Sequence, residues 1–140
     1  MGTIMNTPDQ APSPIRDKWG PALDGGFVVL PAVFLRKQRE LQLNCEDMVV
    51  ISHLIASWWE ADKLPFPRTE TIASRSGLSR RTVQRRLKHL EGRGMLTRVL
   101  TDTGKARRVM AYDLGRLVET LKELGAAEGA LRKERTNNQQ

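Results

Sequence analysis

The stretch SGLSRRTVQRRLKHLEGRG, residues 76–94, has few apolar residues, and arginine fills the gaps between them. On a helix, Val83, Leu87 and Leu90 fall at i, i+4 and i+7 and form a single narrow apolar stripe. Ser79 is a favoured N-cap residue and Gly94 a common helix terminator, so the pattern predicts a helix over 80–92. Such a helix buries one edge and leaves most of its surface, arginines included, outside the core.

The face opposite that stripe carries Arg81, Arg85 and Lys88, flanked by Thr82, Gln84 and His89. Like charges at i, i+4 repel by a few tenths of a kcal/mol. Arg80, Arg81, Arg85 and Arg86 also lie in the first half of the helix, where the helix dipole disfavours cations. Stability alone would not select this arrangement, whereas a negatively charged partner would.

The positive charge is concentrated in one part of the chain. Residues 63–108 hold 13 Lys and Arg against 3 Asp and Glu, a net +10 (13 minus 3), which exceeds the +7 of all 140 residues. A basic balance of this size indicates a polyanionic partner, either nucleic acid or an anionic membrane surface.

The neighbours of this helix suggest how it is used. A short helix over 69–76, with Ile72 and Ala73 facing inward, ends at Gly77 and precedes it. Two strands, MLTRVL and RVMAYDL, follow it around a turn at Gly104. In a helix-turn-helix the second helix enters the major groove while the first lies on the backbone, and Arg and Gln read guanine and adenine. The hairpin would form a wing whose tip offers cations to phosphates or to the minor groove. Those cations are Lys105, Arg107 and Arg108.

The remaining segments complete a mainly α chain. Prolines and glycines over 1–26 predict a flexible arm. A helix is expected over 30–41 with Val33, Phe34 and Leu41 as anchors, and a central core helix over 45–62, capped by Asn44 with Asp47. We assign 27–112 to a winged helix-turn-helix domain and 113–125 to a C-terminal helix. The leucines of that helix either close the domain or pair with a second copy. Residues 126–140 are expected to be a flexible polar tail.

The sequence LPFPRTETIASRSGLSRRTVQRRLKHLEGRGML resembles the winged helix-turn-helix domains of small bacterial regulators and of plasmid or phage replication proteins. The LSRRTVQ…LE part is similar to the GntR-type regulators. The resemblance covers roughly residues 30–112 and implies DNA contacts through the residues Ser79, Arg80, Arg81, Thr82, Gln84 and Arg85, with Lys88 on a phosphate.

Two positions depart from that pattern. Arg68 stands where such domains usually have a small cap residue, so Thr69 is expected to cap the helix and Arg68 to contact a phosphate. Arg86 stands at a position that is often small or apolar. Its side chain is expected either to be exposed or to reach the duplex from the edge of the helix.

Other classes of site find little support. No zinc-protease, P-loop, nucleophile-elbow or paired-cysteine motif occurs, so we expect no catalytic residues, metal or cofactor, and no enzyme. Cys45 is the single cysteine, and no apolar run is long enough to cross a bilayer, which suits a cytoplasmic, nucleoid-associated protein. Trp58 and Trp59 are read either as a platform for stacking bases or, for at least one of them, as core.

These features favour a sequence-specific binder of double-stranded DNA, and specifically a transcriptional repressor that reads the major groove with helix 80–92. The alternative is a plasmid or phage replication or partition factor with the same DNA chemistry. A protein-interaction module and an RNA binder are the rivals from other classes. Homodimerisation is expected, because two half-sites multiply specificity.

Overall fold

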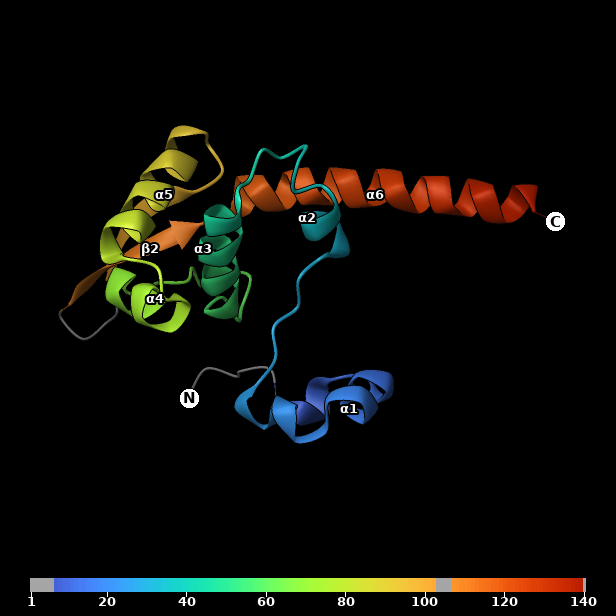
Figure 1. Ribbon diagram of the computed structural model, residues 1–140, viewed down its shortest axis with the longest axis horizontal. Helices are drawn as coiled ribbons and strands as arrows, with labels where there is room; N and C mark the ends of the chain where they lie inside the picture. The colour runs from blue at the N-terminus through green and yellow to red at the C-terminus, as the bar shows by residue number, and fades with distance from the viewer. Residues whose placement is uncertain (1–6, 103–106, 140) are drawn as a thin grey trace.

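The computed structural model describes residues 7–102 and 107–139, and Figure 1 shows a cluster of helices with a hairpin, a long helix leaving it, and a separate N-terminal segment. In chain order the elements are η1 (Pro8–Gln10), α1 (Ser13–Trp19), η2 (Gly20–Gly25), α2 (Ala32–Arg36), α3 (Cys45–Ala56), α4 (Thr69–Ser76), α5 (Arg80–Gly92), β1 (Thr97–Asp102), β2 (Arg108–Asp113) and α6 (Gly115–Asn138). Mainly helical architecture with one small hairpin is the predicted fold class, which is confirmed. None of the helices in the described part of the chain has the length and apolarity to cross a bilayer.

Helix α3 lies at the centre of the core. It begins with a capping box, in which the Asn44 side chain accepts from the Asp47 backbone N–H at 2.8 Å and the Asp47 carboxylate accepts from the Asn44 N–H at 3.0 Å. Met48, Ile51 and Leu54 are buried along it, as their spacing predicted. The helix ends at Ala56, six residues before the predicted end at 62.

The helix–turn–helix itself has the predicted bounds. Gly77 ends α4 with φ +81°, a left-handed conformation that favours glycine, and the Ser79 hydroxyl caps α5 by accepting from the Thr82 N–H at 3.0 Å. The expectation that Thr69 caps α4 was wrong. Arg68 is the N-cap and makes no side-chain cap bond, while Thr69 is already helical and its hydroxyl is bonded to Tyr112.

The hairpin packs against the loop that leads into α4. Strands β1 and β2 pair antiparallel from Thr97 opposite Asp113 to Asp102 opposite Arg108. The Tyr112 N–H donates to the Pro65 carbonyl at 2.9 Å, and the side chains of Ala111 and Tyr112 are buried. The hairpin therefore projects beside the N-terminus of α4. The predicted turn at Gly104 lies outside the described residues.

The first half of α6 closes the same core. Leu114, Leu117 and Leu121 are buried in one cluster with Phe34 of α2 and residues of α3 and α5. Of the two roles that the sequence left open for these leucines, closure of the domain is confirmed.

The ends of the chain are more helical than predicted. Helix α6 continues to Asn138, although the sequence predicted an end near 124 and a frayed tail after it. Its second half is rich in Ala, Leu, Glu, Lys and Arg, and the two glycines at 125 and 129 cost only about 1 kcal/mol each.

Residues 7–26, predicted to be a flexible arm, contain α1 and two 3₁₀ helices, all with proline in the first turn. Helix α2 spans only 32–36 of the predicted 30–41.

Candidate nucleic-acid interface

The second helix of the helix–turn–helix presents an exposed cationic face. Val83, Leu87 and Leu90 are at most 1% exposed, so this edge of α5 is fixed against the core. Arg81, Arg85 and Lys88, on the other side at the same i, i+4, i+7 spacing, are exposed, as is Gln84 beside them. The structure thus places four of the predicted DNA contacts together on one accessible surface.

These exposed cations differ from other cations nearby in having no carboxylate partner. Across residues 7–102 and 107–139, no ion pair involves Arg81, Arg85 or Lys88. Arg80, by contrast, lies 3.1 Å from Glu70 of α4, with both side chains more than half exposed. Such an exposed pair contributes little and is screened by salt. Arg80 can therefore exchange Glu70 for a phosphate.

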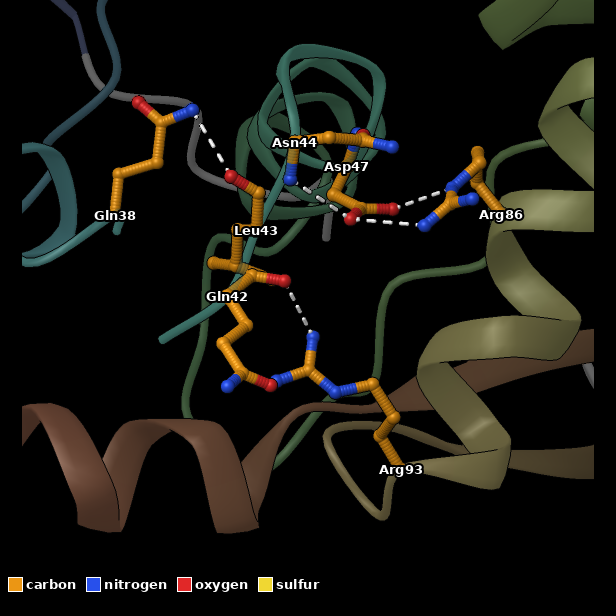
Figure 2. A network of polar contacts seen from close by, with 7 residues as sticks. All are labelled: Gln38, Gln42, Leu43, Asn44, Asp47, Arg86 and Arg93. Carbon is orange, nitrogen blue, oxygen red and sulfur yellow. Dashed lines mark hydrogen bonds and ion pairs between the residues drawn. The ribbon is translucent and has the colours of Figure 1, made fainter. Parts of the chain in front are cut away.

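Arg86 is turned inward, which corrects both expectations for its side chain. Its Nε donates to Asp47 Oδ1 at 2.7 Å and its Nη2 to Asp47 Oδ2 at 3.0 Å, a two-pronged ion pair between α5 and α3 (Figure 2). The Asp47 side chain is 1% exposed and that of Arg86 18%. The hydrogen bond with Asp47 raises the pKa of Arg86 above its ordinary value while burial opposes the shift, so the arginine stays charged at any ordinary pH.

Asp47 joins this ion pair to the start of α3. The same carboxylate accepts from the Asn44 backbone and from Arg86, so the cap of α3 and the anchor of α5 share one group (Figure 2). At the other end of α5, Arg93 donates from Nη1 to the Gln42 carbonyl at 2.8 Å and from Nη2 to the Leu41 carbonyl. Gln38 donates to the Leu43 carbonyl at 3.0 Å and braces the same segment. Helix α5 is therefore held against residues 41–47 near both its ends.

A groove between the start of α4 and β2 gathers the remaining predicted cations. The groove is lined by Phe66 and Arg68 and, some forty residues later in the sequence, by Arg107, Arg108 and Met110. Arg68, Arg107 and Arg108 are exposed. The Tyr112 phenol at its base is buried, which raises its pKa, while the hydrogen bond with Thr69 acts in the opposite direction. Lys105, the remaining predicted wing contact, lies outside the described residues.

Ser79 and Thr82, also predicted contacts, are engaged with each other. The Ser79 hydroxyl donates to Thr82 Oγ1 at 2.9 Å and caps the helix at the same time. Thr82 keeps its own hydroxyl hydrogen for an outside acceptor. Both residues therefore fix the start of α5, next to the surface that Arg81 and Arg85 present.

Sequence reasoning missed the structural role of Asp47 and Arg86, and it missed the exposure of Phe66. The sequence held a signal for the ion pair, because Arg86 lies next to the buried stripe of α5. An arginine in that position is most simply paired with an acid on the core helix. The signal for the exposure of Phe66 was the sequence Pro-Phe-Pro, because successive side chains of an extended segment point to opposite sides. In the described residues no group of three or more His, Cys, Asp and Glu is placed to hold a metal ion, and Cys45 is exposed.

A comparison with protein families agrees with this geometry. Residues 41–96 match the family described as a helix-turn-helix domain. This range begins at the segment whose carbonyls accept hydrogen bonds from Arg93 and ends at the residue before β1. The chain carries a winged helix-turn-helix. The match includes α3, α4 and α5, and the hairpin of β1 and β2 supplies the wing. A comparison with curated proteins found no match. The predicted winged helix-turn-helix domain is confirmed, and it gives the chain a DNA-binding fold.

Replacing Arg86 tests the internal ion pair. Arg86→Ala leaves the Asp47 carboxylate buried without its partner, and we expect it to lower the free energy of unfolding by about 3 kcal/mol. Arg85→Ala, one position away but exposed, should change it by no more than about 0.5 kcal/mol. Urea unfolding followed by circular dichroism measures both. Equal effects of the two substitutions would contradict the assigned roles.

Replacing the exposed arginines tests the outward face. Arg81→Ala and Arg85→Ala should each weaken binding to a cognate duplex by about 1–3 kcal/mol and relax the preference at one base pair, whereas Lys105→Ala should weaken all duplexes alike. Arg16→Ala, on exposed α1, is the matched control and should leave affinity unchanged. Fluorescence anisotropy with cognate and scrambled duplexes reports these changes. If Arg81→Ala binds the cognate site normally, α5 is not the reading helix.

Proposed function

We propose that the protein binds double-stranded DNA sequence-specifically and represses transcription by occupying a promoter. The observation that carries this proposal is the row formed by Arg81, Arg85 and Lys88, exposed and without ion-pair partners in the described residues, on the second helix of the helix–turn–helix. Gln84 lies beside this row and adds a side chain suited to adenine. Repression by occupancy requires nothing beyond such a domain, and the proposed role involves binding without catalysis.

The packing of α5 against the core supports sequence-specific binding of DNA in addition to attachment through phosphates. A base-reading helix must be held rigidly, because hydrogen bonds to base edges depend on position to a fraction of an ångström. The buried stripe of α5, the Asp47 pair and the Arg93 contacts all restrain this helix. Non-specific attachment through phosphates would not require those restraints.

We also propose that two copies pair through α6. An apolar groove of about 480 Å³ lies beside this helix, lined by Val29, Pro31, Trp58, Val118, Gly125 and Ala126 among others, and the same helix continues as an exposed rod from Gly129 to Asn138. An antiparallel pair centred on Gly125 and Ala126 would cover both features at once and obey two-fold symmetry. It would also bring Arg132 of each copy near Glu119 of the other.

Selection of bound fragments from a random duplex library tests the DNA proposal. We expect a defined motif with two inverted half-sites, and promoters should hold such motifs in the genome. With about 6 phosphate contacts, log K for the selected duplex should fall against log salt with a slope near −5. A flat salt response, or no enrichment of any motif, would overturn the proposal. Sites confined to a replication origin or partition locus would favour the replication alternative.

A charge placed in the groove tests the pairing. Ala126→Arg should convert a dimer to a monomer, because a guanidinium cannot be buried against the apolar lining. Ala127→Arg, one residue on and turned away from the groove-lining face, should leave the dimer intact. Light scattering after size exclusion gives the mass. A monomeric parent protein, or two variants that behave alike, would contradict pairing through this face.

A further inference from the structure

Two aromatic side chains are exposed on the segment that joins α3 to α4. Trp59 is 40% exposed and Phe66 is 54% exposed, and both line one hollow. Leu64 lines it as well, together with Lys63 and Glu60, which form an ion pair at 3.0 Å. Trp58, the other member of the tryptophan pair, packs against the core instead. The two tryptophans thus lie in different places: Trp58 lines the apolar groove beside α6, and Trp59 lines the hollow with Phe66.

The backbone around Pro65 and a side-chain hydrogen bond of Trp59 keep the two rings exposed. Pro65 is buried and its carbonyl accepts from the Tyr112 N–H at 2.9 Å, so in an extended segment the next side chain, Phe66, is directed outward. Prolines on both sides restrict the rotation of this segment. Trp59 is held as well, because its Nε1 donates to the Ala56 carbonyl at 2.9 Å. Both rings are presented in fixed positions rather than on loose chain.

Positive charge lies directly beside these rings. Phe66 lines the groove between α4 and β2 as well as the hollow with Trp59, so it forms the wall between the two. Arg68 and Arg108 in that groove are exposed, and in the described ranges neither forms an ion pair. The carboxylate of Glu70, the acid of the groove, is engaged by Arg80. Unpaired cations thus flank the exposed aromatic rings.

Aromatic rings alternating with cations are what single-stranded nucleic acid requires. Its bases stack on aromatic faces without regard to sequence, and its phosphates follow the positive charge. In an intact duplex the base faces are covered by their neighbours, so the rings of Trp59 and Phe66 would find no stacking partner there. We propose that this surface binds single-stranded DNA, with bases on Trp59 and Phe66 and phosphates on Arg68 and Arg108.

The aromatic residues of this surface are not part of the reading face of α5, although Arg68 and Arg108 are also predicted phosphate contacts of a duplex. The aromatic residues come from 59–66, whereas the proposed base-reading side chains come from 81–88. A protein with both could hold a duplex through α5 and retain a strand released beside it. The single-strand proposal therefore predicts an activity that duplex binding does not require and that can fail independently of it.

The test measures binding of the full chain to a labelled oligothymidylate of about 15 nucleotides, near the upper end of known site sizes. Fluorescence anisotropy should show binding that weakens as salt is raised. Trp59→Ala and Phe66→Ala should each weaken it about tenfold, since one stacked base is lost with each ring. Phe66→Leu keeps the apolar bulk and lacks the aromatic face, so it should weaken binding as well.

Matched controls separate this site from the others. Trp19→Ala removes a 54% exposed tryptophan from the N-terminal segment and should leave oligothymidylate binding unchanged. Duplex affinity should be the same in all four variants, and circular dichroism melting should show that each is folded. Absence of oligothymidylate binding would overturn the proposal, as would an equal loss in Trp19→Ala or a parallel loss of duplex affinity in the Trp59 and Phe66 variants. Binding of an oligouridylate at least tenfold tighter would overturn the assignment to DNA.

Discussion

The ion pair between Arg86 and Asp47 is the contact on which the arrangement of this domain depends. It joins α5 to α3 through two hydrogen bonds to a carboxylate that is 1% exposed and that also caps α3. A buried pair of this kind adds little stability over an apolar substitute, but the loss of one partner leaves a charge without compensation. We therefore expect this pair to favour the observed orientation of α5 on α3 rather than to add much stability.

Because α5 is held in this orientation, its cations divide into those that face the core and those that face solvent. Six cations lie on this helix, counting Arg80, Arg81, Arg85, Arg86, Lys88 and the C-cap residue Arg93. The inward members, Arg86 and Arg93, bind a carboxylate and backbone carbonyls, and Arg80 is paired with Glu70. Arg81, Arg85 and Lys88 remain, at the spacing of a single helical face. The fold thus divides one basic helix into arginines that build the scaffold and arginines that face a partner.

On the wing side of the domain, too, some residues are buried and hold the structure while their neighbours are exposed. Tyr112 and Pro65 are buried and bonded through their backbones, which directs Phe66 outward beside Arg68 and Arg108. The domain therefore offers a rigid cationic helix for a duplex and, next to it, a surface with the features of a single-strand site. A protein that acts where a duplex opens would use both, which connects the single-strand proposal with the replication alternative.

The sequence by itself determined most of the local structure. Gly77 ends α4, Ser79 and Gly94 flank α5, and the capping box of Asn44 and Asp47 starts α3. The stripe of Val83, Leu87 and Leu90 determines the buried face of α5. Each of these features depends on neighbours within a few residues. The exposed positions of Arg81, Arg85 and Lys88 follow from that stripe. Only the tertiary structure decided the partner of Arg86, the gathering of Arg68 with Arg107 and Arg108, and the exposure of Phe66. Those outcomes depend on groups that lie about forty residues apart in the chain or on the packing of one element against another, and a pattern of local spacing carries no information about such distances.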